Sequence, residues 1–342
     1  MSDAGRVSDH GLYRLRHESG AVALIDRSCG GTIHRLRLVA PGRNEPVDIL
    51  WGDPDLSAPC GETELFRGRP LVPFADRIKG GTYRFEGRDY RLPLNDLSMG
   101  DAVHGFLYGE PGTLVTGGAG GSSEVTVAIG TRLEGREGYP WSLDVRQTYC
   151  LRADELVYGV GITNRSDSNV PVGAGLHTYF LIPGDGAGGE PAPGVFAPVD
   201  SGCLHIPATG YLEVDDALRP TGRVVPVEGS PWDFRTLRPI GSGELDLAFP
   251  LLGENGAAEN GASKGRAPIR IAGPRYVTSL RMGGAFGMAQ VFIPPGREAV
   301  AVEPVTAPGE CFNRPELGLL VLEPGAAMDA WASITIGRNR LS

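Results

Sequence analysis

The stretch Trp141-Ser-Leu-Asp-Val-Arg-Gln-Thr-Tyr149 is apolar at positions 141, 143 and 145 and polar at the positions between them. A period of two is typical of a β-strand that turns one face to the core and the other to solvent. A second strand-like stretch, Glu155-Leu-Val-Tyr-Gly-Val-Gly-Ile-Thr163, follows the short turn Arg152-Ala-Asp154. We therefore expect the two stretches to pair as neighbouring antiparallel strands.

Strand patterns continue on both sides of this pair, at intervals of about ten residues. No apolar stripe with a helical period lasts longer than two turns, and 51 glycines and 28 prolines favour turns. The pattern predicts an all-β protein, a sandwich or a barrel, with few short helices. The other strands that we expect cover residues 12–17, 21–25, 32–38, 223–227, 268–272, 275–282, 287–293, 298–303, 317–322 and 328–336, and a hairpin covers residues 83–92.

Two segments rich in Gly, Ala, Pro and Glu interrupt the strand pattern, at residues 184–194 and 253–268. Strand patterning resumes unchanged beyond each of them, so we interpret both as surface loops. We accordingly expect one domain over residues 1–342. The run Gly117-Gly-Ala-Gly-Gly121 is not followed by a helical pattern, so we interpret it as a turn and not as a phosphate-binding loop.

Composition limits the classes of partner and compartment. A net charge of -9 argues against nucleic acid and against an anionic membrane surface as the main partner. We see no signal peptide and no apolar segment near the ~20 residues of a membrane helix, so we expect a cytoplasmic protein. Its five cysteines are scattered, odd in number and without a CxxC motif, which favours reduced thiols. Monomer and homodimer both remain open.

Two segments far apart in the sequence each carry a group suited to proton transfer. A strand of small residues, Val172-Gly-Ala-Gly-Leu176, leads to His177, whose neighbours are apolar and aromatic. An imidazole there can titrate near neutral pH, although a core histidine bonded to a carbonyl is an alternative. Glu303 ends an apolar strand and precedes Pro304, which stops the hydrogen-bond ladder. Partial desolvation would raise the pKa of this carboxylate, unless it is a structural ion-pair partner.

Further polar groups lie on loops that flank the hairpin over residues 83–92. Asp76 and Arg77 come before it and His104 comes after it, so we expect the hairpin to bring these three residues together. Asp246 and Gln290 are weak signals alone, and an Asx-turn is the alternative for Asp246. No metal-ligand spacing and no nucleophile elbow is visible in the sequence.

Six short segments, in this order, resemble the aldose 1-epimerase (galactose mutarotase) family and span roughly residues 30 to 335. They are Pro73-Phe-Ala-Asp-Arg-Ile78, Val103-His-Gly105, Gly138-Tyr-Pro-Trp141 leading into Val145-Arg-Gln-Thr-Tyr149, Leu176-His-Thr-Tyr-Phe180, Asp233-Phe-Arg235 before Asp246, and Val302-Glu-Pro304 before Asn313. The resemblance implies a large antiparallel β-supersandwich, which agrees with the strand pattern.

The resemblance also implies roles for individual residues. Glu303 matches the catalytic base and His177 the catalytic acid, while Arg77 and His104 match residues that bind sugar hydroxyls. Asp246 matches the carboxylate that holds further hydroxyls. The chemistry needs one base and one acid, so we expect no metal and no other cofactor.

Two positions depart from the family pattern. Asp76 stands where the family usually has Asn, and Val305 stands where it often has Gln. Asp76 accepts hydrogen bonds but does not donate them, so the preferred sugar can differ from galactose or glucose. The alternative is that Asp76 pairs with a cation such as Arg77 and touches no substrate.

The main functional hypothesis is an aldose 1-epimerase, an isomerase that interconverts the α and β anomers of a monosaccharide. A hexose-phosphate epimerase is an alternative, because Arg67, Arg69 and Arg77 lie close in sequence and cations bind phosphate. A non-catalytic sugar-binding module on the same fold is another. A purely structural sandwich ranks last, because it leaves the ordered appearance of the polar groups unexplained.

Overall fold

The computed structural model describes residues 11–53, 56, 60, 65–120, 123–182, 198–251 and 265–339, with the backbone alone for 117–120. Every strand pair assigned in this part of the chain is antiparallel, so the predicted all-β class is confirmed. The helices described are three single turns of 3-10 helix: η1 (Leu107–Gly109), η2 (Val199–Ser201) and η4 (Pro315–Leu317).

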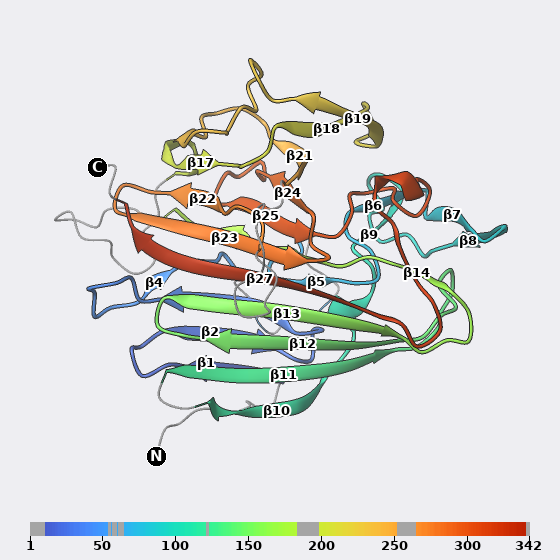
Figure 1. Cartoon of the computed structure of the whole chain (residues 1–342), viewed down its shortest axis with the longest axis horizontal. Coiled ribbons are helices and arrows are strands. Elements are labelled where there is room, and N and C mark those ends of the chain that lie inside the picture. Colours follow the sequence, from blue (N-terminus) through green and yellow to red (C-terminus); the bar gives the residue numbers. More distant parts are fainter. Residues whose placement is uncertain are drawn as a thin grey trace.

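The largest sheet has nine strands and crosses the whole width of the molecule (Figure 1). Residues 143–149 of the predicted stretch belong to β12, which continues to Leu151 and pairs with β13 as predicted. Its alternating side chains put the apolar row into the core. In spatial order the strands are β10 (Thr113–Gly120), β11 (Glu124–Leu133), β12 (Leu143–Leu151), β13 (Glu155–Asn164), β27 (Ala327–Arg338), β23 (Tyr276–Gly284), β22 (Ile269–Ala272), β17 (Cys203–His205) and β20 (Arg238–Pro239).

A six-stranded sheet lies against it and carries two of the polar candidates, Asp246 and Glu303. Alternate residues of its central strands face opposite sides, so Val291 and Val302 enter the core while Gln290 and Glu303 face away from it. One contiguous apolar cluster contains residues of both sheets, as a sandwich requires. The strands are β21 (Asp246–Pro250), β24 (Met288–Phe292), β25 (Val300–Val305), β15 (Gly175–Leu176) and β5 (Pro70–Leu71), with β16 (Tyr179–Phe180) also paired to β25.

Smaller sheets complete the molecule. A four-stranded sheet is formed by β1 (Leu12–Arg16), β2 (Val22–Asp26), β3 (Thr32–Leu38) and β4 (Val47–Asp48). Two-stranded units are formed by β6 (Arg77–Lys79) with β9 (Asp101–Val103), β7 (Thr82–Phe85) with β8 (Arg88–Arg91), β14 (Val170–Val172) with β26 (Leu320–Leu322), and β18 (Gly210–Val214) with β19 (Pro220–Pro226). The β7–β8 pair is the predicted hairpin with its turn at Glu86-Gly87.

Two expectations from the sequence are wrong. The glycine run from Gly117 is not a turn as far as Gly120, because it forms the end of edge strand β10, which β11 holds by its ladder. The expectation of reduced thiols fails for Cys29 and Cys60, which form a disulfide between positions 31 residues apart. Tertiary proximity decides such a pairing, and cysteine spacing does not reveal it. The remaining cysteines, Cys150, Cys203 and Cys311, are free thiols.

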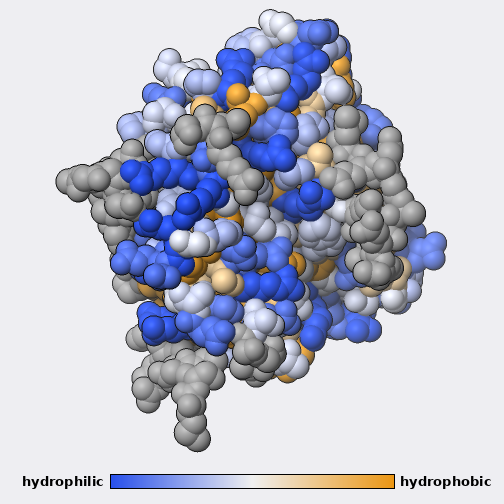
Figure 2. All heavy atoms as spheres, turned by 60° about the vertical axis from the view of Figure 1, so that its left-hand side comes forward, coloured by the Kyte–Doolittle hydropathy of each residue, from blue (hydrophilic) through white to orange (hydrophobic). Residues whose placement is uncertain are grey.

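The visible face in Figure 2 is mostly hydrophilic, with small apolar areas scattered between polar side chains. Among the described residues, no helix has the length and apolar character needed to cross a membrane. The loops predicted at 184–194 and over most of 253–268 lie outside the described residues. The single-domain organisation and the cytoplasmic location stay predictions.

Candidate functional site

Glu303 and His177 lie opposite each other on neighbouring strands of the six-stranded sheet. The register of β25 with β15 and β16 continues across the two residues between these short strands, and it places the two side chains side by side. His177 Nε2 is 3.5 Å from Glu303 Oε1, and both side chains are buried. This distance is within ion-pair range when His177 is protonated and is long for a hydrogen bond.

The small residues before His177 have a packing reason. Gly173 N–H donates to Pro73 O, and a Cβ at 173 would lie 3.0 Å from Thr306 Oγ1. A Cβ at Gly175 would lie 3.0 Å from a methyl group of Val305. Small residues at these two positions therefore leave room for the neighbouring segments of the chain.

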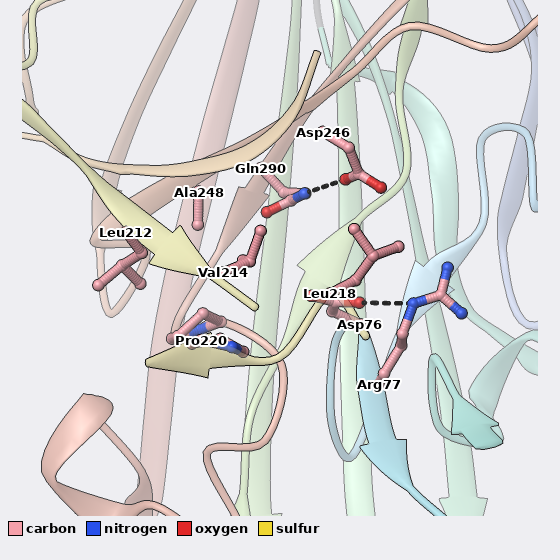
Figure 3. Close-up of a pocket in the computed structure, with 10 residues that line it drawn as sticks. Asp76, Arg77, Leu212, Val214, Leu218, Pro220, Asp246, Ala248 and Gln290 are labelled. Carbon is pink, nitrogen blue, oxygen red and sulfur yellow. Dashed lines mark hydrogen bonds and ion pairs between the residues drawn. The ribbon is translucent and has the colours of Figure 1, made fainter. Parts of the chain in front are cut away.

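A second carboxylate lies on the same face of the sheet, two strands away from Glu303. Gln290 on β24 is the register partner of Glu303 on one side and of Ala248 on the other. Its side-chain Nε2 donates to Asp246 Oδ1 at 2.6 Å, which Figure 3 shows as a dashed line. Asp246 thus begins a strand, and the alternative of an isolated Asx-turn is wrong.

The loop before the hairpin brings Asp76 and Arg77 to the same region as His104. β6 pairs with β9, and at the end of this ladder His104 N–H donates to Asp76 O. The Asp76 N–H donates in turn to His104 Nδ1 at 3.1 Å. Nδ1 is therefore the acceptor of the ring, so a neutral His104 carries its proton on Nε2. Asp76 and His104 both have positive φ angles, 56° and 63°, which fits strained backbone at a functional site.

Arg77 and Asp76 are held by further contacts. Arg77 binds Asp96 through an ion pair of 2.6 Å, and its Nε is 3.8 Å from Asp76 Oδ1 (Figure 3). Gly309 N–H donates to Asp76 Oδ2 at 3.2 Å, and a Cβ at 309 would lie 2.6 Å from that oxygen. The conformation of this pair is therefore set before any ligand arrives.

Aromatic rings surround the imidazole of His177. Tyr179 stacks on it with ring centroids 5.0 Å apart, and Phe66 lies nearly parallel to it at 6.5 Å. Phe66 also makes an edge contact with His104 at 4.6 Å. The two histidines themselves meet edge to face at 5.0 Å. These rings shield the His177 imidazole from water.

Arg67 and Arg69, which suggested a phosphate site, share a carboxylate instead. Arg67 lies 3.3 Å and Arg69 lies 3.2 Å from oxygens of Asp53, and Arg67 stacks over Trp51 at 3.8 Å. The Arg69 side chain is buried. These contacts do not leave a cluster of exposed cations of the kind that a phosphate group attracts.

A model of the family described as "Aldose 1-epimerase" matches residues 11–335, nearly the whole chain. This match covers both sheets and every polar candidate described above. The chain belongs to the aldose 1-epimerase family.

Galactose mutarotases and a maltose epimerase are among the proteins similar to this chain. The galactose mutarotase of Pongo abelii is 31% identical over 74% of this chain and 67% of its own length. That of Rattus norvegicus is 29% identical over 70% of this chain, and the match spans 64% of the rat protein. The maltose epimerase of Levilactobacillus brevis is 25% identical over 71% of this chain and 67% of its own length.

Solved structures of family members share the fold. A galactose mutarotase-like protein from Clostridium acetobutylicum superposes with a TM-score of 0.79 at 18% identity, covering 98% of each chain. The galactose 1-epimerase of Lactobacillus acidophilus gives 0.75 at 17% identity, over 98% of this chain and 97% of its own. The predicted galactose mutarotase-like supersandwich is confirmed.

Burial and neighbouring charges change the proton affinities of the pair in this aldose 1-epimerase family member. Burial, and then the charges of Asp76 and Asp246, raise the pKa of Glu303 well above its usual value. Burial, and then His104, lower the pKa of His177 well below its usual value. Glu303 is consequently a stronger base, and a protonated His177 a stronger acid, than either group would be in water.

The residues around the pair are shifted as well. Burial, and then Asp246, raise the pKa of Asp76 to about 6. Burial, and then Arg77, lower the pKa of His104 to about 3, so this imidazole is neutral at pH 7. Burial raises the pKa of Asp246, although Gln290 and Arg77 oppose the shift.

The Asp76 shift leads to a prediction about stability. Because folding raises the pKa of Asp76, its contribution is favourable below the unfolded value and is lost as pH rises through about 6. Asp76→Asn keeps an acceptor for Gly309 and removes the charge. We expect it to increase the free energy of unfolding at neutral pH by on the order of 1–3 kcal/mol, at the lower end because the side chain is 26% exposed.

The measurement is urea unfolding of both proteins at several pH values between about 4 and 7. The increase in the free energy of unfolding of Asp76→Asn over the wild type should become larger as pH rises over this range. The control Asp89→Asn, at an exposed position, should not show this pH dependence. A gain that is independent of pH would show that ionisation of Asp76 is not its cause. The variant should also lower the pKa of Glu303, since a neighbouring negative charge is removed, and so shift the matching limb of a pH–rate profile to lower pH.

The fold brings together the six residues proposed from the sequence, which are Asp76, Arg77, His104, His177, Asp246 and Glu303. Of their neighbours, Gln290 was only a weak signal in the sequence, and Phe66 was missed. The alternation of β24 could have shown that Gln290 faces away from the core, but only the strand order reveals Asp246 as its partner. Phe66 gave no signal, because it lies in a loop outside any strand pattern.

Proposed function

We propose that the protein is an aldose 1-epimerase that interconverts the α and β anomers of a free monosaccharide. The observation that carries the proposal is the buried His177–Glu303 pair, 3.5 Å apart on one face of the sheet. O1 and the ring oxygen of a pyranose are both bonded to C1. A base for one and an acid for the other must therefore converge within a few ångströms of each other.

In the proposed reaction Glu303 takes the proton of the C1 hydroxyl while His177 gives a proton to the ring oxygen. The C1–O5 bond breaks and a C1=O1 carbonyl forms, which opens the ring. Rotation about the C1–C2 bond presents the other carbonyl face. Ring closure then reverses both proton transfers and returns Glu303 and His177 to their starting protonation states. The reaction therefore neither consumes nor releases a proton.

The remaining candidates have roles in holding the sugar. Arg77 donates to sugar oxygens, and Asp246 with Gln290 binds hydroxyls away from C1. His104 offers its Nε2–H as a donor, because Asp76 N–H occupies its Nδ1. Asp76 accepts from a hydroxyl beside Arg77. Fixing a neutral ring by several short polar contacts places C1 against the pair, which is the positioning part of catalysis.

The test is polarimetry with freshly dissolved α-D-galactose and α-D-glucose. We expect at least one sugar to approach its equilibrium rotation at a rate that increases linearly with protein concentration. Saturable sugar binding without any change in rate would instead support the non-catalytic module. A rate that falls on adding inorganic phosphate would favour the phosphorylated substrate, against which the Asp53 contacts of Arg67 and Arg69 argue.

A further inference from the structure

One pocket joins a polar end to an apolar wall, and the wall comes from a single hairpin (Figure 3). Asp76, Arg77, Asp246 and Gln290 form the polar end. The cavity volume is only about 20 Å³, roughly the space of one water molecule, so the side chains that line the pocket fill most of it. On the other side lie four residues of the β18–β19 hairpin, which are Leu212, Val214, Leu218 and Pro220.

Leu218 occupies the tip of this hairpin. In Figure 3 its side chain is drawn between the Asp246 carboxylate and the Asp76–Arg77 pair, and all four residues line the one pocket. Its φ angle is +58°, a conformation that costs a branched side chain free energy and that glycine adopts freely. A strained leucine directed at a polar site suggests a functional reason for its presence.

The tip is held rigidly in this position. Asp215 Oδ1 accepts from the N–H groups of Ala217 and Arg219, each at 3.0 Å. Its other oxygen binds the Arg219 guanidinium at 2.7 Å. Arg314 donates to Pro220 O at 2.6 Å and so ties the hairpin to the loop that follows β25. These contacts hold the hairpin tip, and with it Leu218, in this conformation.

The sheet geometry indicates which part of a sugar meets this wall. One strand, β24, separates β25 from β21, so these two strands are about 10 Å apart. Asp246 lies two residues along β21 from Ala248, which is level with Glu303. In the proposed function, a pyranose with C1 at Glu303 would extend across β24 towards Asp246. Its C4, the ring atom opposite C1, then points towards Asp246 and Leu218.

We propose that Leu218 is a specificity-determining residue that restricts the site to sugars with a free hydroxyl at C4. This inference rests on the proposed function, because it places C1 at Glu303. A substituent on O4 would have to occupy the space of the Leu218 side chain. The substrate class is then a monosaccharide, and 4-linked disaccharides are excluded.

The experiment compares glucose and galactose with their 4-O-methyl ethers, each as a pure anomer, in polarimetry. We expect wild-type kcat/KM to be lower for the ethers by about 10-fold or more, the size of one misplaced carbon group in a tight pocket. Glycine adopts the positive φ at position 218 freely, so Leu218→Gly should fold normally. It should reduce the difference in kcat/KM between ethers and parent sugars by a similar factor. Val224→Ala trims an exposed side chain of the same hairpin and should leave this difference unchanged.

Equal kcat/KM for the ethers and the parent sugars in the wild type would overturn the inference. It would also fail if Leu218→Gly left the difference in kcat/KM unchanged, or if Val224→Ala reduced this difference as much as Leu218→Gly does. If no sugar is turned over at all, the proposed function fails instead. Calorimetric Kd values for the same sugars would then decide the inference separately. Equal Kd ratios of ether to parent in wild type and Leu218→Gly would count against it.

Discussion

Glu303→Gln is expected to lower kcat for anomer exchange by about 10²- to 10⁴-fold, the usual contribution of a positioned general base. The amide keeps the size and shape of the carboxylate but has no useful basicity. Because the pKa of Glu303 is raised by burial and by two neighbouring carboxylates, the lost base is a strong one. KM should change little, since Arg77 and Asp246 would still hold the sugar.

The rate is measured by polarimetry at saturating sugar, with near-ultraviolet circular dichroism to confirm the fold. Removing a buried charge that is costly to desolvate should leave the fold intact or more stable. Glu323→Gln makes the same chemical change at an exposed position and serves as the control. A Glu303→Gln protein that keeps the wild-type rate would eliminate Glu303 as the base.

His177→Asn is expected to lower kcat by a similar factor, about 10²- to 10⁴-fold, because the ring oxygen loses its proton donor. Asn retains a polar group of smaller size between the Tyr179 and Phe66 rings but does not exchange protons near neutral pH. If the two residues act as one unit, the double variant should be hardly slower than either single variant. Additive losses in the logarithm of kcat would show that they act independently.

His205→Asn is the matched control for this variant, because His205 lies on β17 in the nine-stranded sheet, away from the pair. Its rate should equal that of the wild type. The kcat and KM of each variant are to be separated, since a loss confined to KM would assign His177 to binding and not to proton transfer.

The surroundings of Glu303 affect its protonation. Asp76 adds a third carboxylate beside Asp246 and Glu303 and so raises the pKa of Glu303. The apolar clusters on either side of Glu303 exclude water from it. One contains Tyr179 and Ala301, and the other contains Leu71 and Val305. The neighbouring negative charges and the loss of solvent therefore both raise the pKa of Glu303.

The amino-acid sequence alone determined the all-β class, the approximate positions of many strands and the identity of the polar candidates. These features depend on local patterns, since alternation along one strand sets which face is buried. The pairing of β12 with β13 and of β7 with β8 was predictable because only a short turn separates the two strands of each pair. The meeting of Asp76 and His104 was predictable for the same reason, because a hairpin returns the chain to its starting point.

Tertiary structure decided the contacts between segments that are distant in the chain. His177 and Glu303 meet through the register of β25 with two short strands, and Gln290 meets Asp246 through the order of β21 and β24. The glycine run in β10 is a strand because β11 supplies its ladder, against its local preference for turns. Such contacts depend on the order of the strands in each sheet. Packing of the whole core determines this order, and the residue pattern of a single strand does not reveal it.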